Sequence, residues 1–243
     1  MRWIGSRRTS VALDTQKILM LQLHYYPSNA SLTPHILLEE MGVPFELKLV
    51  DRANNAQKSP EYLKLNPNGL IPVLVDGDLV LYETAAICLH LVDSYPDKGL
   101  APAVGTRERA EFYKWLMWMT NTMQPSLIMY FYTDRYTTST DAAEIARIKA
   151  KTQERIGAML KQLNDQLATS GGPWMLGDSF SVLDIYAFML CRWTRVFEGA
   201  PPATQPARDA AAWLHLGPFM QRMLERPAVQ RVIAKEGLKP PVI

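Results

Sequence analysis

Four polar residues stand immediately before a predicted helix near the start of the chain. Tyr26, Ser28, Asn29 and Ser31 follow a short apolar run, and Gly42 ends the apolar helical pattern that begins after them. Their hydroxyl and amide groups can donate hydrogen bonds, and the first turn of a helix carries a partial positive charge. A segment of this kind is suited to binding a negatively charged atom.

Three longer motifs stand at predicted turns and helix starts. Residues 65–74 have the sequence Leu-Asn-Pro-Asn-Gly-Leu-Ile-Pro-Val-Leu, which is typical of a turn that leads into a strand. Residues 82–87 place Glu83 and Thr84 at the start of a helix. Ser181 and Asp184 have the spacing of a capping box, so we assign their motif to folding rather than to chemistry.

Length and composition favour two domains and a small-molecule partner. The formal net charge of +2 over 243 residues gives no strong field for nucleic acid or a membrane surface. The two cysteines, Cys88 and Cys191, lie in apolar stretches without a neighbouring Cys or His at metal-ligand spacing. The first 20 residues lack the apolar centre of a secretory signal. We therefore expect a cytoplasmic protein without a metal, a disulfide, or a nucleic-acid or membrane partner.

The first hundred residues alternate between strand and helix patterns. Strands are predicted at 21–26 and 45–49, and Ser31 or Thr33 is expected to cap the helix between them. An Asp-Gly turn joins the strands 71–75 and 79–82, and a helix follows. Because Pro72 has no ladder donor, its strand is expected at a sheet edge or irregular there. The prediction is a four-stranded mixed sheet in the order βαβββα, or βαβαββα with a weak helix between the halves.

The remainder of the chain has only helical patterns. One long helix is predicted from Thr106 to about Tyr132, with a kink at Pro125, and others at 141–167, 181–196 and 216–236. The fold class is therefore α+β, with a helical bundle as the second domain. We expect domains at 20–97 and 106–243, after a disordered or accessory tail at 1–19.

The three motifs, in this order and spacing, resemble those of the cytosolic glutathione transferases. The resemblance covers residues 20–237 and implies a thioredoxin-like domain that binds glutathione as co-substrate. Residues 25–32 are similar to the bacterial beta class, but Ala30 stands where that class has a cysteine, and Gln124 where it has a histidine. The chain therefore resembles the beta, nu and phi classes without the beta-class cysteine.

The resemblance also implies which residues bind glutathione. A cis Ile71–Pro72 bond would turn the polar backbone groups of Ile71 toward the cysteinyl part. The γ-glutamyl carboxylate would meet the Thr84 hydroxyl and a helix N-terminus, with Glu83 facing the ammonium group. Lys58 resembles a lysine that faces the glycyl carboxylate, although an exposed surface role fits it equally well.

Catalysis in this family requires the glutathione thiol to ionise, because a free thiol of pKa about 8.5 is only a few per cent thiolate near neutrality. We favour the Ser28 hydroxyl as the group that stabilises the thiolate. Ser31, Asn29 and Tyr26 remain alternatives.

The second substrate would be a small apolar electrophile. We expect it between the glutathione site and the long helix, against Trp118, Met119 and Thr122. The family resemblance further implies a symmetric homodimer with a role in detoxification.

Two other functions are compatible with the same motifs. One is a glutathione-dependent disulfide-bond oxidoreductase similar to the nu class, which also works without a catalytic cysteine. The other is a noncatalytic glutathione-binding or stress-response protein.

Overall fold

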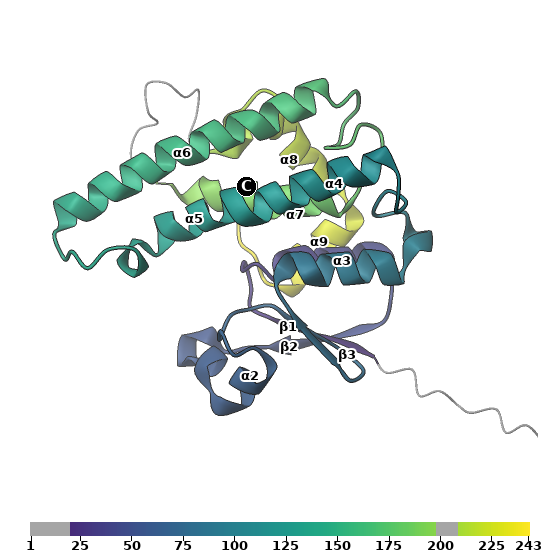
Figure 1. The fold of residues 1–243 in the computed structure, drawn as a ribbon, viewed down its shortest axis with the longest axis horizontal. Helices are drawn as coiled ribbons and strands as arrows, with labels where there is room; N and C mark the ends of the chain where they lie inside the picture. The colour runs from purple at the N-terminus through teal and green to yellow at the C-terminus, as the bar shows by residue number, and fades with distance from the viewer. Residues whose placement is uncertain (1–19, 198–208) are drawn as a thin grey trace, which may run out of the picture.

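The computed structural model describes residues 20–197 and 209–243, and it has a sheet domain below a larger helical domain (Figure 1). The predicted tail at 1–19 lies outside the described residues. No helix in the described part of the chain is long and apolar enough to span a membrane.

The sheet domain contains a four-stranded mixed sheet, as predicted. Its strands are β1 (Leu21–Tyr25), β2 (Phe45–Leu49), β3 (Val73–Asp76) and β4 (Leu79–Tyr82), in the order β2-β1-β3-β4. β1 pairs parallel with β2 and antiparallel with β3, and β3 pairs antiparallel with β4. Its helices are α1 (Leu32–Met41), α2 (Pro60–Leu65) and α3 (Thr84–Ser94), so the order is βαβαββα.

Of the two alternatives for the strand at Pro72, the edge position is wrong, because β3 lies between β1 and β4, and the local irregularity is confirmed, because Pro72 lies outside the regular strand. Pro72 is tolerated there because β3 begins one residue later, at Val73, so the missing N–H removes no ladder hydrogen bond. The Ile71–Pro72 bond is cis, as the family resemblance implied.

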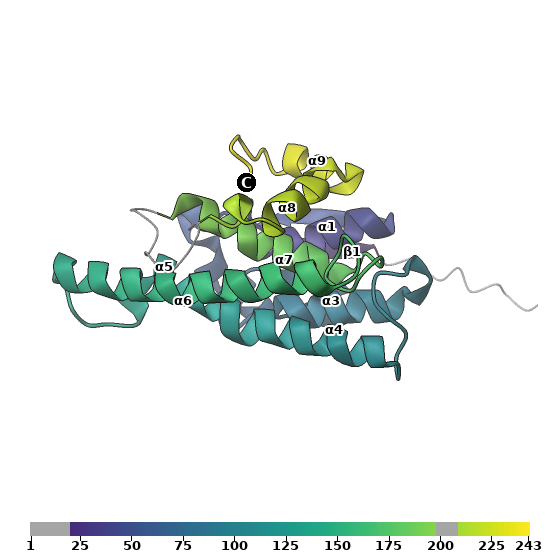
Figure 2. The ribbon, with the colours of Figure 1, turned by 90° about the horizontal axis from the view of Figure 1, so that it is seen from above.

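The helical domain surrounds one fully buried helix. Its helices are α4 (Arg107–Trp118), α5 (Gln124–Phe131), α6 (Ala142–Thr169), α7 (Val182–Trp193), α8 (Leu216–Glu225) and α9 (Pro227–Lys235). Every residue of α7 is buried, and the view from above shows α7 among α6, α8 and α1 (Figure 2). α9 packs against α1, so the last helix of the chain lies on the first helix of the sheet domain.

The predicted long helix is interrupted rather than continuous. A π-helical turn, Met119–Met123, separates α4 from α5 and ends two residues before Pro125, where the kink was predicted. Proline has no N–H for the carbonyl four residues earlier, and its ring would clash with that carbonyl in a regular α-helix. The wider turn accommodates the proline, and the Ser126 hydroxyl donates a 2.8 Å hydrogen bond to the Thr122 carbonyl.

The predicted capping box at the start of α7 is confirmed. The Asp184 carboxylate accepts the N–H of Ser181, and the Ser181 hydroxyl accepts the N–H of Leu183. The Asp184 carboxylate also accepts the N–H of Met175 at 2.8 Å, so one buried side chain joins the preceding loop to the central helix.

Candidate functional site

Two adjoining cavities lie near the loop between β1 and α1. The larger cavity has a volume of about 570 Å³ and lies between the two domains. From the sheet domain it is lined by Asn29, Ala30, Arg52, Gln57, Lys58, Asn68, Gly69, Leu70 and Ile71. From the helical domain it is lined by Gln124, Ile128, Tyr132, Arg135 and Trp193. Both domains are therefore needed to form it.

A smaller cavity of about 200 Å³ adjoins the larger one. It is lined by Ser28, Phe131, Arg195 and Val196, together with five residues that line both cavities: Asn29, Arg52, Ile128, Tyr132 and Trp193. The shared wall places the loop between β1 and α1 where the two cavities meet.

The loop before β3 is held in place by a buried amide. The Asn66 side chain donates to the Leu70 carbonyl at 2.8 Å and accepts the N–H of Asn68 at 3.0 Å. Gly69 has a φ of 61°, and a Cβ there would lie 2.8 Å from both the Gln57 carbonyl oxygen and the Lys58 ammonium nitrogen. Only glycine fits this turn, which brings Lys58 and Ile71 to the same cavity.

Lys58 is exposed at the rim of the larger cavity. Its ammonium group donates only a long hydrogen bond, 3.3 Å, to the Asn68 carbonyl. It is therefore available to a carboxylate in the cavity.

Glu83 and Thr84 lie beside the Ile71 side of the larger cavity but are not among the described residues that line it. Tyr82 pairs with Val73, so the start of α3 lies close to Ile71 and Pro72. Glu83 is exposed with a φ of 73°, and Thr84 is the buried first residue of α3. The N–H groups of the first turn of this helix are those that the sequence prediction assigned to a carboxylate.

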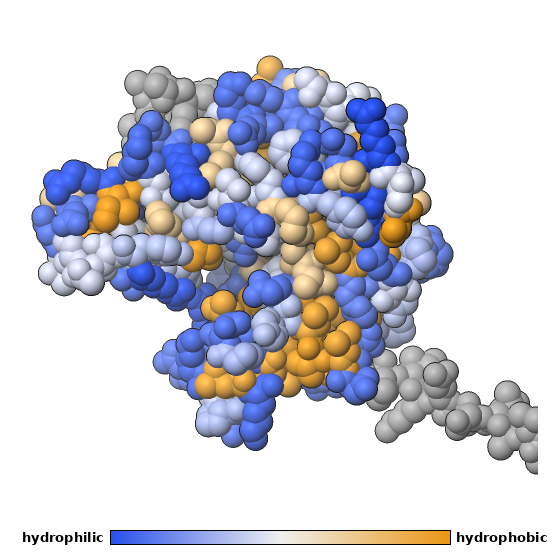
Figure 3. Space-filling model, in the orientation of Figure 1, coloured by the Kyte–Doolittle hydropathy of each residue, from blue (hydrophilic) through white to orange (hydrophobic). Residues whose placement is uncertain are grey.

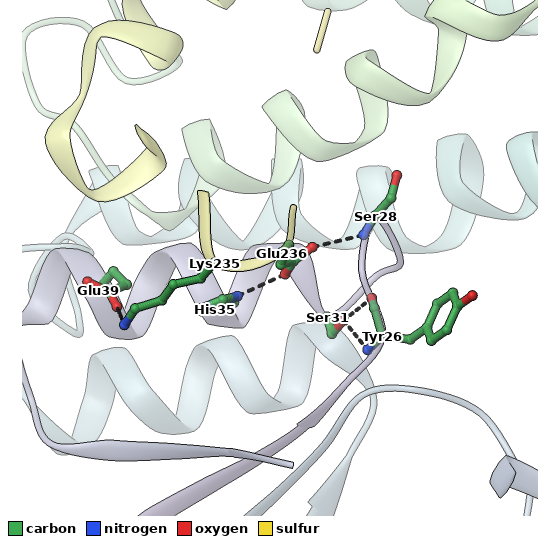
Figure 4. A network of polar contacts seen from close by, with 7 residues as sticks. All are labelled: Tyr26, Ser28, Ser31, His35, Glu39, Lys235 and Glu236. Atoms are coloured by element: carbon green, nitrogen blue, oxygen red, sulfur yellow. Dashed lines mark hydrogen bonds and ion pairs between the residues drawn. The ribbon is translucent and has the colours of Figure 1, made fainter. Parts of the chain in front are cut away.

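Of the four polar residues before α1, Ser28 is the one whose N–H and hydroxyl are both bonded to charged side chains of the helical domain. Its φ of 63° is unusual for a residue with a Cβ, and its N–H donates to the Glu236 carboxylate at 2.8 Å (Figure 4). Its hydroxyl accepts a 2.7 Å hydrogen bond from the Arg192 guanidinium. The hydroxyl proton therefore remains available to a partner in the smaller cavity.

Ser31 occupies the N-cap position of α1, but the predicted side-chain cap is absent. Its hydroxyl instead donates to the Tyr26 carbonyl at 3.0 Å and accepts the Tyr26 N–H at 3.2 Å, and the residue is fully buried (Figure 4). Thr33 does not cap α1 either, because its hydroxyl donates to the Met189 sulfur. Neither Ser31 nor Tyr26 is among the described residues that line the larger or the smaller cavity, whereas Asn29 lines both.

None of the three predicted second-substrate residues is among the described residues that line the larger or the smaller cavity. Trp118 lies in a groove between α4 and α6 with Trp115, and Met119 is completely buried. Thr122 belongs to the π-helical turn and lines neither cavity. The apolar wall of the smaller cavity is formed further along, by α5 and the end of α7.

Both cavities have a cationic lining. Arg52, Lys58, Arg135 and Arg195 line one or both of them, and none of the described lining residues is acidic. The arrangement suits a ligand with net negative charge. Among the described residues, no group of three His, Cys, Asp or Glu side chains is placed to hold a metal ion.

Sequence reasoning missed most of the helical-domain wall. Only Gln124 was singled out, from the histidine that the beta class has there. Tyr132, Trp193 and Arg195 gave no local signal, since aromatic and basic residues on helices usually belong to cores and solvated faces. Their role depends on contacts between distant parts of the chain.

Comparison with known proteins identifies both domains. Residues 27–94 match the family described as the glutathione S-transferase N-terminal domain, and residues 123–236 match its C-terminal domain. The chain is 31% identical to glutathione S-transferase GST-4.5 of Xanthomonas campestris, over 90% of this chain and 100% of that protein. It is also 27% identical to the disulfide-bond oxidoreductase YfcG of Escherichia coli, over 90% of this chain and 97% of that protein.

A solved structure has the same fold. A glutathione transferase homologue from Sulfitobacter, crystallised with bound glutathione, superposes with a TM-score of 0.76 at 28% identity. The match covers 89% of this chain and 98% of that one. With both domains matched in order, the chain belongs to the glutathione S-transferase family.

Proposed function

We propose that the protein is a glutathione transferase that ionises the thiol of glutathione and directs it at an apolar electrophile. The observation that carries the proposal is the meeting of two cavities at the loop that contains Ser28 and Asn29. The larger cavity would hold glutathione, and the smaller one would hold the second substrate. The sulfur would lie at their shared wall.

In the larger cavity, the charges of glutathione match the residues present. The Lys58 ammonium group would face the glycyl carboxylate, and the backbone of Ile71 would pair with the cysteinyl part. The first turn of α3, with Thr84, would bind the γ-glutamyl carboxylate, while Glu83 faces the ammonium group. Glutathione would thus be held at both ends, away from the sulfur.

The Ser28 hydroxyl would donate a hydrogen bond to the thiolate, and the Asn29 side chain is a further polar group of the same loop that lines this cavity. The thiolate then attacks the electrophilic carbon, a carbon–sulfur bond forms, and the leaving group departs with its electron pair. The protein's own thiols take no part. Cys88 and Cys191 are fully buried, and burial raises the pKa of both.

The proposed function is tested with glutathione and two second substrates. Calorimetric titration is expected to show binding of glutathione, and a chlorinated dinitrobenzene is expected to be conjugated. A protein that binds glutathione but turns over neither this substrate nor a small disulfide would be the noncatalytic binder instead. Absence of glutathione binding would overturn the proposal.

Disulfide reduction is the second candidate function, favoured by the similarity to YfcG over nearly the whole chain. Here the same thiolate would attack a disulfide sulfur and release the other thiolate, and a second glutathione would complete the reduction. Faster turnover of a small disulfide such as hydroxyethyl disulfide than of the chlorinated aromatic would assign this activity.

Phe131→Ala is expected to raise KM for the chlorinated aromatic by about fivefold to thirtyfold, from the loss of roughly 1 to 2 kcal/mol of apolar contact. Phe131 lines the smaller cavity but not the larger one. The variant loses a contact to the second substrate alone. The affinity for glutathione should therefore remain within about twofold of wild type. Steady-state kinetics with each substrate varied in turn measures both effects.

Trp118→Ala is the matched control for this variant. Trp118 was the sequence-based candidate, and it lies in the groove between α4 and α6. We expect no change in KM for either substrate. A raised KM in Trp118→Ala with none in Phe131→Ala would return the second-substrate site to the position predicted from sequence.

We also propose a symmetric homodimer in a reducing, cytoplasmic setting. Apolar side chains gather over the sheet domain in the space-filling view (Figure 3), and Leu79 and Val80 on the edge strand β4 are 40% and 39% exposed. An exposed apolar edge of this kind is usually covered in solution. Sedimentation equilibrium is expected to give twice the chain mass of 27.5 kDa, and Leu79→Glu should shift it toward the monomer. A monomeric wild type would refute the dimer.

A further inference from the structure

The backbone of Ser28 is held by a residue from the other end of the chain. Its left-handed conformation, with a φ of 63°, is unfavourable for a side chain with a Cβ. Its N–H donates to Oε2 of Glu236 at 2.8 Å, and its side chain points away from that carboxylate (Figure 4). The Glu236 carboxylate therefore stabilises a conformation that the loop would otherwise rarely adopt.

Glu236 follows α9 directly, and its side chain has no exposed surface. Its other oxygen, Oε1, lies 2.8 Å from Nδ1 of His35, an equally buried residue of α1 (Figure 4). In many proteins the free energy lost by removing a carboxylate from water exceeds the free energy gained from its ion pair. We therefore expect this buried pair to have a role other than stabilisation of the fold. Docking α9 on α1 is not that role, because Glu39 already pairs with Arg231 and Lys235 at the surface.

The hydroxyl of Ser28 is held from the opposite side by Arg192 of α7. This residue is 2% exposed, and Nη1 donates to the Ser28 hydroxyl oxygen at 2.7 Å. Among the described residues no carboxylate forms a salt bridge with Arg192, and its Nε has no hydrogen-bond partner. Burial lowers the pKa of Arg192 to about 10, so the side chain remains a cation at neutral pH.

A hydroxyl that accepts a hydrogen bond from a cation becomes a stronger donor through its own proton. The Arg192 guanidinium thus prepares the Ser28 hydroxyl to donate toward the smaller cavity, where a thiolate would lie. Of the other titratable groups nearby, Arg52, Tyr132 and Arg195 line this cavity, and His35 contacts Glu236. Arg192 differs from them because it contacts the hydroxyl directly.

We propose that Glu236 and Arg192 are positioning residues that together set Ser28 for thiol ionisation, Glu236 through its N–H and Arg192 through its hydroxyl. The inference rests on the proposed role of Ser28 and adds that the helical domain controls the acidity of the thiol. Both residues lie far from Ser28 in sequence: Arg192 is separated from it by 164 residues and Glu236 by 208.

The test measures thiolate absorbance of bound glutathione against pH in wild type and Arg192→Met. We expect the thiol pKa to rise by about one unit and turnover of the chlorinated aromatic at pH 7 to fall about fivefold to tenfold. Glutathione affinity should stay within about twofold, because the groups that hold both ends of the peptide are unchanged. Arg192→Lys keeps the charge and should recover part of the loss.

Glu236→Ala should raise the thiol pKa in the same direction, whereas Glu236→Gln, which retains an oxygen acceptor for the Ser28 N–H, should do so less. Glu39→Ala is the matched control, since it removes two ion pairs between α1 and α9 without contacting Ser28. An equal rise of the thiol pKa in Glu39→Ala would show that docking of α9, rather than this contact, is responsible, and would overturn the inference for Glu236.

A double-variant cycle separates this inference from the proposed function. If Ser28→Ala raises the thiol pKa and Arg192→Met adds nothing in that background, Arg192 acts through Ser28. If Ser28→Ala raises the thiol pKa and Arg192→Met alone does not, the role of Arg192 is refuted and that of Ser28 stands. If Ser28→Ala has no effect, the proposed role of Ser28 is itself refuted.

Discussion

Ser28→Ala is expected to raise the pKa of the bound glutathione thiol by about one to two units, because one hydrogen bond to a charged group contributes about 1.5 to 3 kcal/mol. Turnover near neutral pH should fall by roughly tenfold or more and recover as the pH is raised above the new thiol pKa. Glutathione binding should change little, since in the proposed site Lys58, Ile71 and Thr84 would bind parts of glutathione other than its sulfur.

The measurement is thiolate absorbance against pH, with turnover followed over the same range. Ser31→Ala is the control, because the Ser31 hydroxyl is buried and already bonded to both backbone groups of Tyr26. Asn29→Ala tests the second candidate in the loop, because the Asn29 side chain is polar and the residue lines both cavities. A raised thiol pKa in Asn29→Ala alone would move the assignment to Asn29, and no change in any variant would leave the helix N-terminus as the activating group.

The features of the fold that sequence predicted correctly are those with local causes. Gly42 ends α1 in a left-handed conformation, and Gly77 adopts the same conformation in the turn between β3 and β4, because each depends on the backbone freedom of glycine. That turn is shifted by one residue from the predicted Asp76-Gly77 to Gly77-Asp78, since Asp76 ends β3 and pairs with Leu79. Ser181 and Asp184 cap α7 through bonds within four residues. Such signals are contained in a few consecutive residues, so a single sequence is enough to read them.

The errors concern elements whose position depends on distant parts of the chain. The central place of β3 depends on its pairing with β1, about fifty residues earlier, which no local pattern around Pro72 records. The assignment of Trp118 to the second substrate stays a prediction. The π-helical turn after Trp118 changes the phase of the helix before the residues that line the smaller cavity. The apolar lining of the smaller cavity therefore comes from α5 rather than from α4, and its contact with a second substrate is a proposal.

The candidate site shows the same division. Residues of the β1–α1 loop and the turn before β3 were found because they belong to short motifs. Arg192 and Glu236 were not, since a basic residue within an apolar helix and an acidic residue after an amphipathic one are unremarkable by themselves. Their partners in the loop become visible only when α7 and α9 are packed against α1.

Asp184→Ala is expected to lower the free energy of unfolding by about 3 to 5 kcal/mol, the largest loss of stability that we predict for one polar substitution. The Asp184 carboxylate is fully buried and accepts N–H groups of Met175 and Ser181, each at 2.8 Å. Alanine would leave both buried donors without a partner, at about 1 to 3 kcal/mol each, and would also remove the cap of α7. Urea denaturation followed by circular dichroism measures the change.

The pH dependence of stability gives a second measure of the same carboxylate. Burial raises the pKa of Asp184 to about 6, although its hydrogen bonds oppose the shift. Between about pH 4 and pH 6 the folded protein then holds a proton that the unfolded chain has lost, so this group's contribution to stability falls as the pH rises through that window. Asp184→Asn, which cannot ionise, should lack this component.

Asp141→Ala is the matched control for the effect on stability. Asp141 also caps a helix, α6, by accepting the N–H of Ala143 at 2.9 Å, but it is exposed. Water can replace that bond, so we expect a loss of only about 1 kcal/mol. If Asp184→Ala and Asp141→Ala unfold at the same urea concentration, the two buried N–H groups of Met175 and Ser181 have found other partners in the variant. Asp184 would then contribute no more to stability than an ordinary helix cap.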